Sequence, residues 1–276
     1  MAEFLVVFRE TLEAVLIIGI LLTYLKKTNQ NSLIPRIWQG VGFALSLSIL
    51  LSILIQYIAG GFSGQSEKIF EGVIMILAAC VLGSMIIWMA RNTNIAKELE
   101  GQAQSVIQEG EGAALGIFIL AFIAVFREGI ETVLFLYGIM LNQGGLSLLS
   151  SIAGAVIACS LGYIIFIQGQ KVPLKTFFNV SSILLIFVAA GMMAYGTHEL
   201  ESAEIIADTG RAWDVNPPRH PDDSYPVLHD KGSIGSILKG LFGWNGDPSY
   251  LEVCVWFLSL SGLTVLWKKA LHSGNR

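Results

Sequence analysis

Two short motifs place glutamates and arginines at the same spacing in two distant parts of the chain. The first motif is RETLE at residues 9–13, and the second is REGIE at residues 127–131. In a helix, the two glutamates of each motif share a face, and the arginine reaches the second glutamate four residues on. Four carboxylates and two arginines leave two negative charges in excess. In a low dielectric such an excess requires protons or a bound cation.

The candidate metal ligands are the four motif carboxylates, Glu10, Glu13, Glu128 and Glu131. Oxygen ligands alone suit a hard cation such as ferric iron, Mn²⁺, Mg²⁺ or Ca²⁺, and ferrous iron is also accepted. Alternatives remain open, namely another divalent metal or protons as cargo, and pairing of Arg with Glu that only holds helices together. A membrane-embedded di-iron enzyme is less favoured, because such bundles typically supply Glu-x-x-His pairs.

The chain around these charges is too apolar for an ordinary soluble domain. Its mean hydropathy is +0.65, and 54% of the 276 residues are hydrophobic while only 14% are charged. Soluble chains carry nearer a quarter charged residues, about 25%. Composition therefore predicts an all-α polytopic membrane protein in a lipid bilayer. The net charge of −4 is too small to indicate a nucleic-acid partner.

The charges of the first motif are expensive if they face lipid. Three ionised side chains would cost roughly 8–10 kcal/mol, whereas the Phe, Leu, Val and Ile residues of the same segment return only about 4–8 kcal/mol. Arg9, Glu10 and Glu13 must therefore face protein, water or an ion. Intramembrane ionisable residues generally mark functional sites, and a cation path is the simplest use of this set.

Hydropathy and chain-breaking residues predict seven transmembrane helices. Their expected ranges are about 4–25, 38–59, 69–90, 113–137, 146–168, 177–197 and 250–267. Most basic residues of the short loops then fall on one side, among them Lys26, Lys27, Arg36, Arg91, Lys268 and Lys269. The positive-inside rule therefore predicts an outside N-terminus and a cytoplasmic C-terminus.

The two halves of the chain also resemble each other. FRETLEAVLI matches FREGIETVLF, and the third span resembles the sixth more faintly. A duplicated unit of three helices must enter the membrane from opposite sides, so we expect an inverted repeat with a site near the membrane midplane. The expected units are a first repeat at 1–91, a cytoplasmic connector at 92–112, a second repeat at 113–197, an extracytoplasmic loop at 198–249, and a seventh helix with a cytoplasmic tail at 250–276.

The paired motifs resemble the R-E-G-L-E signature of Ftr-type high-affinity iron permeases, including the bacterial EfeU-type members. The likeness extends to IFEGVIMILAACVLGSMIIWM at 69–89 and FVAAGMMAYGTHELE at 187–201. It covers nearly the whole chain, and one departure is Thr11, where the first motif usually has Gly. The resemblance implies an iron permease of the cytoplasmic membrane that is not an enzyme and has no prosthetic group.

For the site, the resemblance implies that the motif glutamates Glu10, Glu13, Glu128 and Glu131 bind the transported iron. Arg9 and Arg127 would set their charge and orientation. It also implies an extracytoplasmic partner that oxidises ferrous iron and delivers ferric iron.

Further acidic residues lie near the predicted outer surface. Glu71 stands at the outer end of the third span, and THELES at 197–202 ends the sixth with His198, Glu199 and Glu201. One histidine and several carboxylates at the outer mouth indicate a candidate outer collecting site for cations. The competing interpretation is that they are ordinary residues at helix ends.

Overall fold

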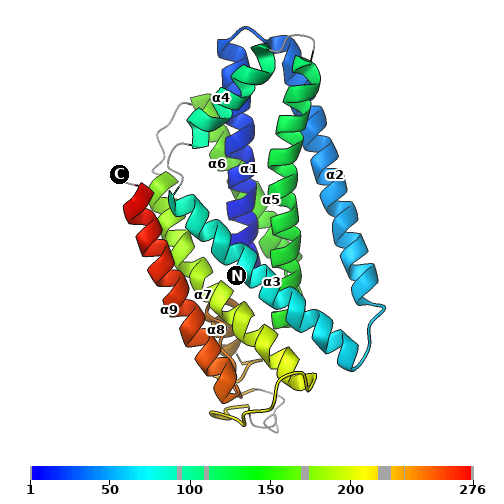
Figure 1. The fold of residues 1–276 in the computed structure, drawn as a ribbon, viewed down its shortest axis with the longest axis vertical. Helices are drawn as coiled ribbons and strands as arrows, with labels where there is room; N and C mark the ends of the chain where they lie inside the picture. Colours follow the sequence, from blue (N-terminus) through cyan, green and yellow to red (C-terminus); the bar gives the residue numbers. More distant parts are fainter. Residues whose placement is uncertain are drawn as a thin grey trace.

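The computed structural model describes residues 2–91, 95–108, 112–168, 174–216, 225–232 and 234–274. Within these ranges every regular element is a helix, and one isolated β-bridge joins Arg211 to Ser249. Figure 1 shows the helices as one elongated bundle. The prediction of an all-α fold is therefore confirmed.

The helices follow the apolar segments of the chain. Gly64 and Gly144 adopt a left-handed backbone at φ 62° and 71°, each in a turn between two helices. The elements are α1 (Ala2–Lys27), the short 3₁₀ turn η1 (Asn31–Leu33), α2 (Ile34–Ala59), α3 (Gln65–Arg91), α4 (Ile95–Gln108), α5 (Ala113–Gln143), α6 (Leu148–Gln168), α7 (Leu174–Ser202), α8 (Gly235–Phe242) and α9 (Tyr250–Gly274).

The protein is a multi-pass membrane protein. In the described part of the chain, six helices are long and apolar enough to cross a bilayer, namely α2, α3, α5, α6, α7 and α9. α1 has 26 residues, which is as long as α2, but it carries Arg9, Glu10 and Glu13 in its first half. Its length permits a crossing, and its charges set it apart from the other six.

Pairs of helices from the two halves of the chain pack against each other. α1 lies along α6, α2 along α5, and α3 along α7, while α1 also contacts α5. Glycines permit close backbone approach in each pair: a side chain at Gly40 would meet α5, and one at Gly154 would meet α1. Gly72 of α3 and Gly196 of α7 lie against each other in the same way. Such small residues let membrane helices come together.

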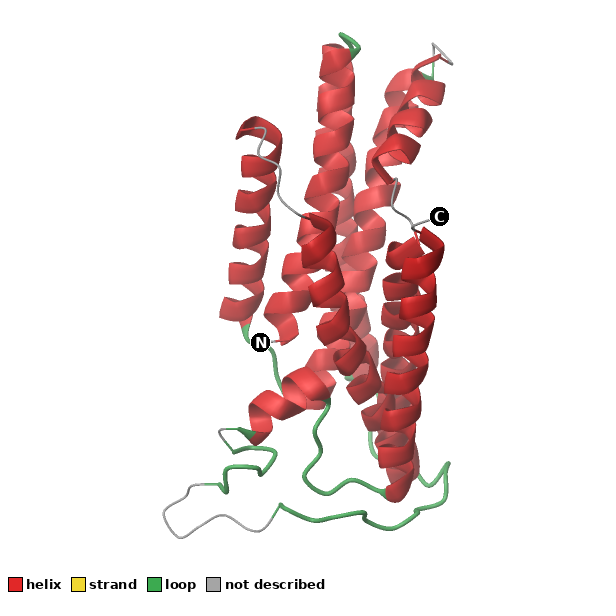
Figure 2. Ribbon diagram, turned by 90° about the vertical axis from the view of Figure 1, so that its left-hand side faces the viewer, coloured by secondary structure: helices red, strands yellow, loops and turns green. Residues whose placement is uncertain are grey.

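The connector and the long connection lie at opposite ends of the bundle. α4 packs on α1 and α5, and its buried Ala103 joins a core cluster with residues of both helices. The segment between α7 and α9, which includes α8, lies at the other end (Figures 1 and 2). Parts of both predicted segments, at 92–94, 109–111, 217–224 and 233, lie outside the described residues.

Several helices extend beyond the predicted spans. α5 continues to Gln143, α7 to Ser202 and α9 to Gly274, and α8 was not expected at all. Hydropathy marks only where the apolar composition stops, whereas backbone hydrogen bonding continues into polar ends. His198, Glu199 and Glu201 consequently belong to the last turns of α7 and not to a loop.

Candidate metal site

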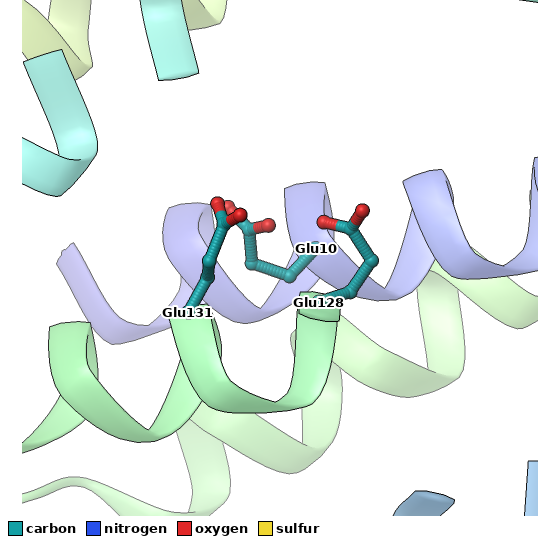
Figure 3. Close-up of side chains that lie close together, drawn as sticks. All are labelled: Glu10, Glu128 and Glu131. Carbon is teal, nitrogen blue, oxygen red and sulfur yellow. The ribbon is translucent and has the colours of Figure 1, made fainter. Parts of the chain in front are cut away.

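Carboxylates from both motifs converge where α1 contacts α5. Glu10 comes from α1, and Glu128 and Glu131 come from consecutive turns of α5 (Figure 3). Each offers a carboxylate oxygen, and these oxygens lie within 4.8 Å of one another. Among the described residues, this is the only group of three or more His, Cys, Asp or Glu side chains at such spacing. We call it the three-carboxylate cluster.

The cluster is buried and poorly satisfied by hydrogen bonds. Glu10 is 1% exposed and Glu128 is 2% exposed. Both oxygens of Glu10 and one oxygen each of Glu128 and Glu131 have no hydrogen-bond partner. Buried polar atoms in proteins almost always have partners, and those without one need an explanation. A bound cation or protons would supply the missing interactions.

The fourth predicted ligand, Glu13, lies outside the three-carboxylate cluster. Its Oε1 is 3.0 Å from Nε of Arg9, as the spacing of four residues predicted. Arg9 is completely buried, and its Nη2 donates a hydrogen bond of 2.8 Å to Sδ of Met89 on α3. The two glutamates of the first motif therefore have different partners. Glu10 lies with the carboxylates of α5, and Glu13 forms an ion pair with Arg9.

The arginine of the second motif behaves differently. Arg127 Nη2 and Nε donate to Oε1 of Glu128 at 2.8 Å and 3.1 Å, while Nε is 3.6 Å from Oε1 of Glu131. The predicted contact with Glu131 is present, but the adjacent Glu128 is closer. The Arg127 side chain is 46% exposed and its guanidinium carbon lies 4.8 Å from the ring centroid of Trp88. One arginine is thus locked in the interior and the other is accessible.

The two motifs differ at two positions between their glutamates, and packing bears on the difference between Thr11 and Gly129. Any side chain at Gly129 would collide with Ser48 of α2. Ser48 is itself buried and its hydroxyl donates to the carbonyl oxygen of Ala44 at 2.9 Å. A side chain at position 129 would therefore disturb the packing of α2 on α5, whereas Thr11 of the first motif is half-buried.

The four predicted outer residues do not form a second cluster of three or more ligands in the described chain. Glu71 of α3 and Glu199 of α7 are close enough for their charges to interact, beside the contact of Gly72 with Gly196. His198 Nδ1 lies 2.9 Å from Oε1 of Glu252, and Glu201 accepts hydrogen bonds from Ser249 and Thr209. Two of the four residues are thus engaged, His198 with α9 and Glu201 with the outer connection.

Glu252 is a buried carboxylate that the sequence reasoning missed. It is 2% exposed at the first turn of α9 and also accepts a hydrogen bond of 2.8 Å from Asn245. Ser249 and Glu252 cap each other: Glu252 Oε1 accepts from the Ser249 backbone N–H, and Ser249 Oγ accepts from the Glu252 backbone N–H. The signal was present as SYLE at 249–252, the capping-box pattern ahead of an apolar run.

Comparisons with known proteins were made over the whole chain. Residues 1–271 match the sequence profile described as the Iron permease FTR1 family. A protein of Yersinia pestis named ferrous iron permease EfeU is 32% identical over 266 residues, which cover 96% of this chain and 92% of that protein. A protein of the same name from Escherichia coli O6:K15:H31 is 32% identical over 259 residues, covering 93% and 91% of the two chains. No solved structure matches the chain.

Proposed function

The chain belongs to the iron permease FTR1 family, and from this premise we propose that iron crosses the membrane through the three-carboxylate cluster. The resemblance drawn from the two R-E-x-x-E motifs is confirmed. Members are permeases and not enzymes, so the di-iron enzyme is set aside. Iron is the transported substrate, and the proposal requires no prosthetic group.

The observation that carries the proposal is that carboxylates from two motifs far apart in the chain lie close together and buried. Four oxygens of Glu10, Glu128 and Glu131 have no hydrogen-bond partner. With all three carboxylates ionised, Arg127 leaves two negative charges, which a divalent cation neutralises. Ferrous iron has that charge and accepts oxygen ligands. We assign Glu13 to the same site as a fourth ligand, which would have to leave its ion pair with Arg9 to bind the cation.

The two relatives are named as permeases of ferrous iron. We therefore propose that ferrous iron reaches the outer face of this chain. The alternative expectation, that an extracytoplasmic partner oxidises the iron and delivers it in the ferric state, is a competing proposal. Supplying the two oxidation states separately distinguishes them.

We propose further that the fold is an inverted repeat of seven transmembrane helices. In such a repeat, α1 is equivalent to α5, α2 to α6 and α3 to α7. The contact of α1 with α6 is then equivalent to the contact of α5 with α2, and the contact of α3 with α7 is equivalent to itself. These are the pairs that pack most extensively. Such pairing supports repeats at 1–91 and 113–197 related by a pseudo-twofold axis, with α9 added outside the duplication.

The orientation follows the positive-inside rule in this proposal. The N-terminus and the connection between α7 and α9 then lie outside, and α4 and the C-terminus lie in the cytoplasm. Import into the cytoplasm would begin at the outer collecting site. Within this site, His198 and Glu201 already have the hydrogen-bond partners described above, so Glu71 and Glu199 would bind the cation first. His198 and Glu201 would contribute by releasing their partners Glu252, Ser249 and Thr209.

The test is uptake of radioactive iron into liposomes that contain the purified protein. Ferrous and ferric iron are supplied separately, each with and without a pH gradient. Glu10→Gln, Glu128→Gln and Glu131→Gln keep the side-chain shape, remove one charge each, and are expected to reduce uptake to the background of empty liposomes. Glu204→Gln changes an exposed carboxylate outside the cluster and is the matched control. Normal uptake by the cluster variants would reject the site assignment.

Competition experiments address the remaining alternative of a different cargo. An excess of Mn²⁺, Zn²⁺ or Pb²⁺ is added to the same uptake assay. Failure of all three ions to compete, together with saturable iron uptake, supports iron as the specific cargo. Faster transport of another ion than of iron would contradict it.

A further inference from the structure

A cavity of about 330 Å³ adjoins the motifs and lies between α1, α3, α4 and α5. On α1 its wall runs from Glu13 to Ile20, and on α5 from Arg127 back to Leu120. The ends of each stretch are seven residues apart in sequence, or about 10 Å along a helix. The two helices run in opposite directions, so both stretches lead from the motifs toward the end of the bundle that carries α4 (Figure 1).

The polar groups of this cavity stand at its two ends. Glu13 and Arg127 belong to the motifs, and Glu98 and Gln102 lie on successive turns of α4. Apart from these four, the residues lining the cavity are aliphatic, Trp88 and Met89. Glu13 is only 7% exposed, so the cavity brings a nearly buried motif carboxylate within the same space as a carboxylate of the connector.

We propose that this cavity is the inward vestibule of the permease and that Glu98 is the carboxylate that receives the cation after it leaves the motifs. The proposal rests on the proposed function, because it assigns a release route to the same transported ion. Apolar walls offer a cation no ligands, so a negative charge at the far end lowers the barrier to leaving the buried carboxylates. Glu13, beside the three-carboxylate cluster and on the cavity wall, is the intermediate ligand.

The helix α4 is well placed for this role. Its buried Ala103 joins a core cluster with residues of α1 and α5, and Glu98 of the same helix lines the cavity. Glu100, two residues on, does not line the cavity. The connector therefore does not only join the two halves of the chain. Its helix α4 forms one wall of the release route and supplies the carboxylate of Glu98.

The first test separates release from binding. Glu98→Gln is expected to slow iron uptake into liposomes roughly tenfold, a barrier change of about 1.4 kcal/mol, while the affinity for ferrous iron, measured by equilibrium dialysis in detergent, stays that of the wild type. Glu98→Asp keeps the charge and is expected to restore most of the rate. Glu100→Gln is the matched control on the same helix and is expected to transport normally.

The second test maps the vestibule by thiol labelling. Gln102→Cys is introduced into a protein whose three native cysteines, Cys80, Cys159 and Cys254, are replaced by alanine. A membrane-impermeant thiol reagent is expected to block uptake when it acts from the side that carries α4, and to have no effect from the other side. Gln104→Cys does not line the cavity and is expected to be labelled without a block.

The outcomes distinguish the two levels of the proposal. A wild-type rate in Glu98→Gln, an equal loss in Glu100→Gln, or an equal block at Gln104→Cys would overturn the vestibule while leaving the cluster intact. Absence of iron uptake by the wild type, or normal uptake by Glu10→Gln, would instead reject the proposed function.

Discussion

The guanidinium of Arg127 on α5 stacks over the indole of Trp88 on α3, with 4.8 Å between the guanidinium carbon and the ring centroid. The next residue of α3, Met89, accepts the hydrogen bond of Arg9 from α1. Two consecutive residues near one end of α3 thus contact the arginines of both motifs. This arrangement makes α3 a common support for the charges that balance the glutamates.

Removal of the Trp88 ring is expected to impair transport without unfolding the protein. Arg127 is half-exposed, and a cation–π contact of about 0.5–2 kcal/mol holds it beside Glu128. Trp88→Ala should therefore lower iron uptake several-fold, and Trp88→Phe should lower it less. Trp38→Ala removes an exposed indole of α2 and serves as the control. Equal rates in Trp88→Ala and the wild type would show that the stacking does not position Arg127.

Arg9 is expected to be essential for stability. Arg9→Met leaves the Glu13 carboxylate buried without its partner, and breaking a buried pair costs about 3–5 kcal/mol. Thermal unfolding in detergent should occur at a clearly lower temperature. The double variant Arg9→Met/Glu13→Gln should recover part of the loss, because it leaves no unpaired charge at that position. Arg127→Met, which changes the exposed arginine, is expected to destabilise less.

Exchange of the residues between the motif glutamates should have unequal consequences. Gly129→Thr places a side chain against Ser48 and is expected to separate α5 from α2, with a loss of about 1–3 kcal/mol from overpacking. Thr11→Gly should be tolerated, apart from the helix propensity of glycine. Membrane-inserted yield and melting temperature report both effects. If Gly129→Thr/Ser48→Gly regains stability, the collision with Ser48 is the cause.

Metal binding to the cluster should stabilise the folded protein. A ligand that binds only the folded state at a hundred times its dissociation constant adds about 2.7 kcal/mol. Ferrous iron under anaerobic conditions is therefore expected to raise the unfolding temperature of the wild type and of Glu204→Gln. The double variant Glu10→Gln/Glu128→Gln should show no such rise. A rise of the same size in the double variant would place the metal elsewhere.

The capping box of α9 is expected to hold the outer connection in place. Ser249→Ala removes the cap of the Glu252 backbone N–H and the hydrogen bond to Glu201, for a loss of about 1 kcal/mol or more. Faster hydrogen exchange should be confined to the first turn of α9 and the last turn of α7. Ser261→Ala, which removes a hydroxyl in the middle of α9, is the control.

Much of the architecture was predictable because it depends on local composition. Long apolar runs require helices in lipid, where every backbone group must be satisfied within the segment. The segment that we assigned to a connector, 92–112, contains the helix α4. The ends of α5 and α7 and the short helix α8 were not predicted, since polar residues continue a helix without any signal in hydropathy.

The spacing of the two motifs was enough to predict that four carboxylates and two arginines lie on the faces of two apolar helices, since residues three and four apart share a face on any α-helix. Only the tertiary structure decided how those charges are shared. The contact and rotation of α1 and α5 bring Glu10, Glu128 and Glu131 together, leave Glu13 with Arg9, and turn Arg127 toward Glu128 and Trp88. These choices depend on packing between helices far apart in the chain, which local spacing does not specify.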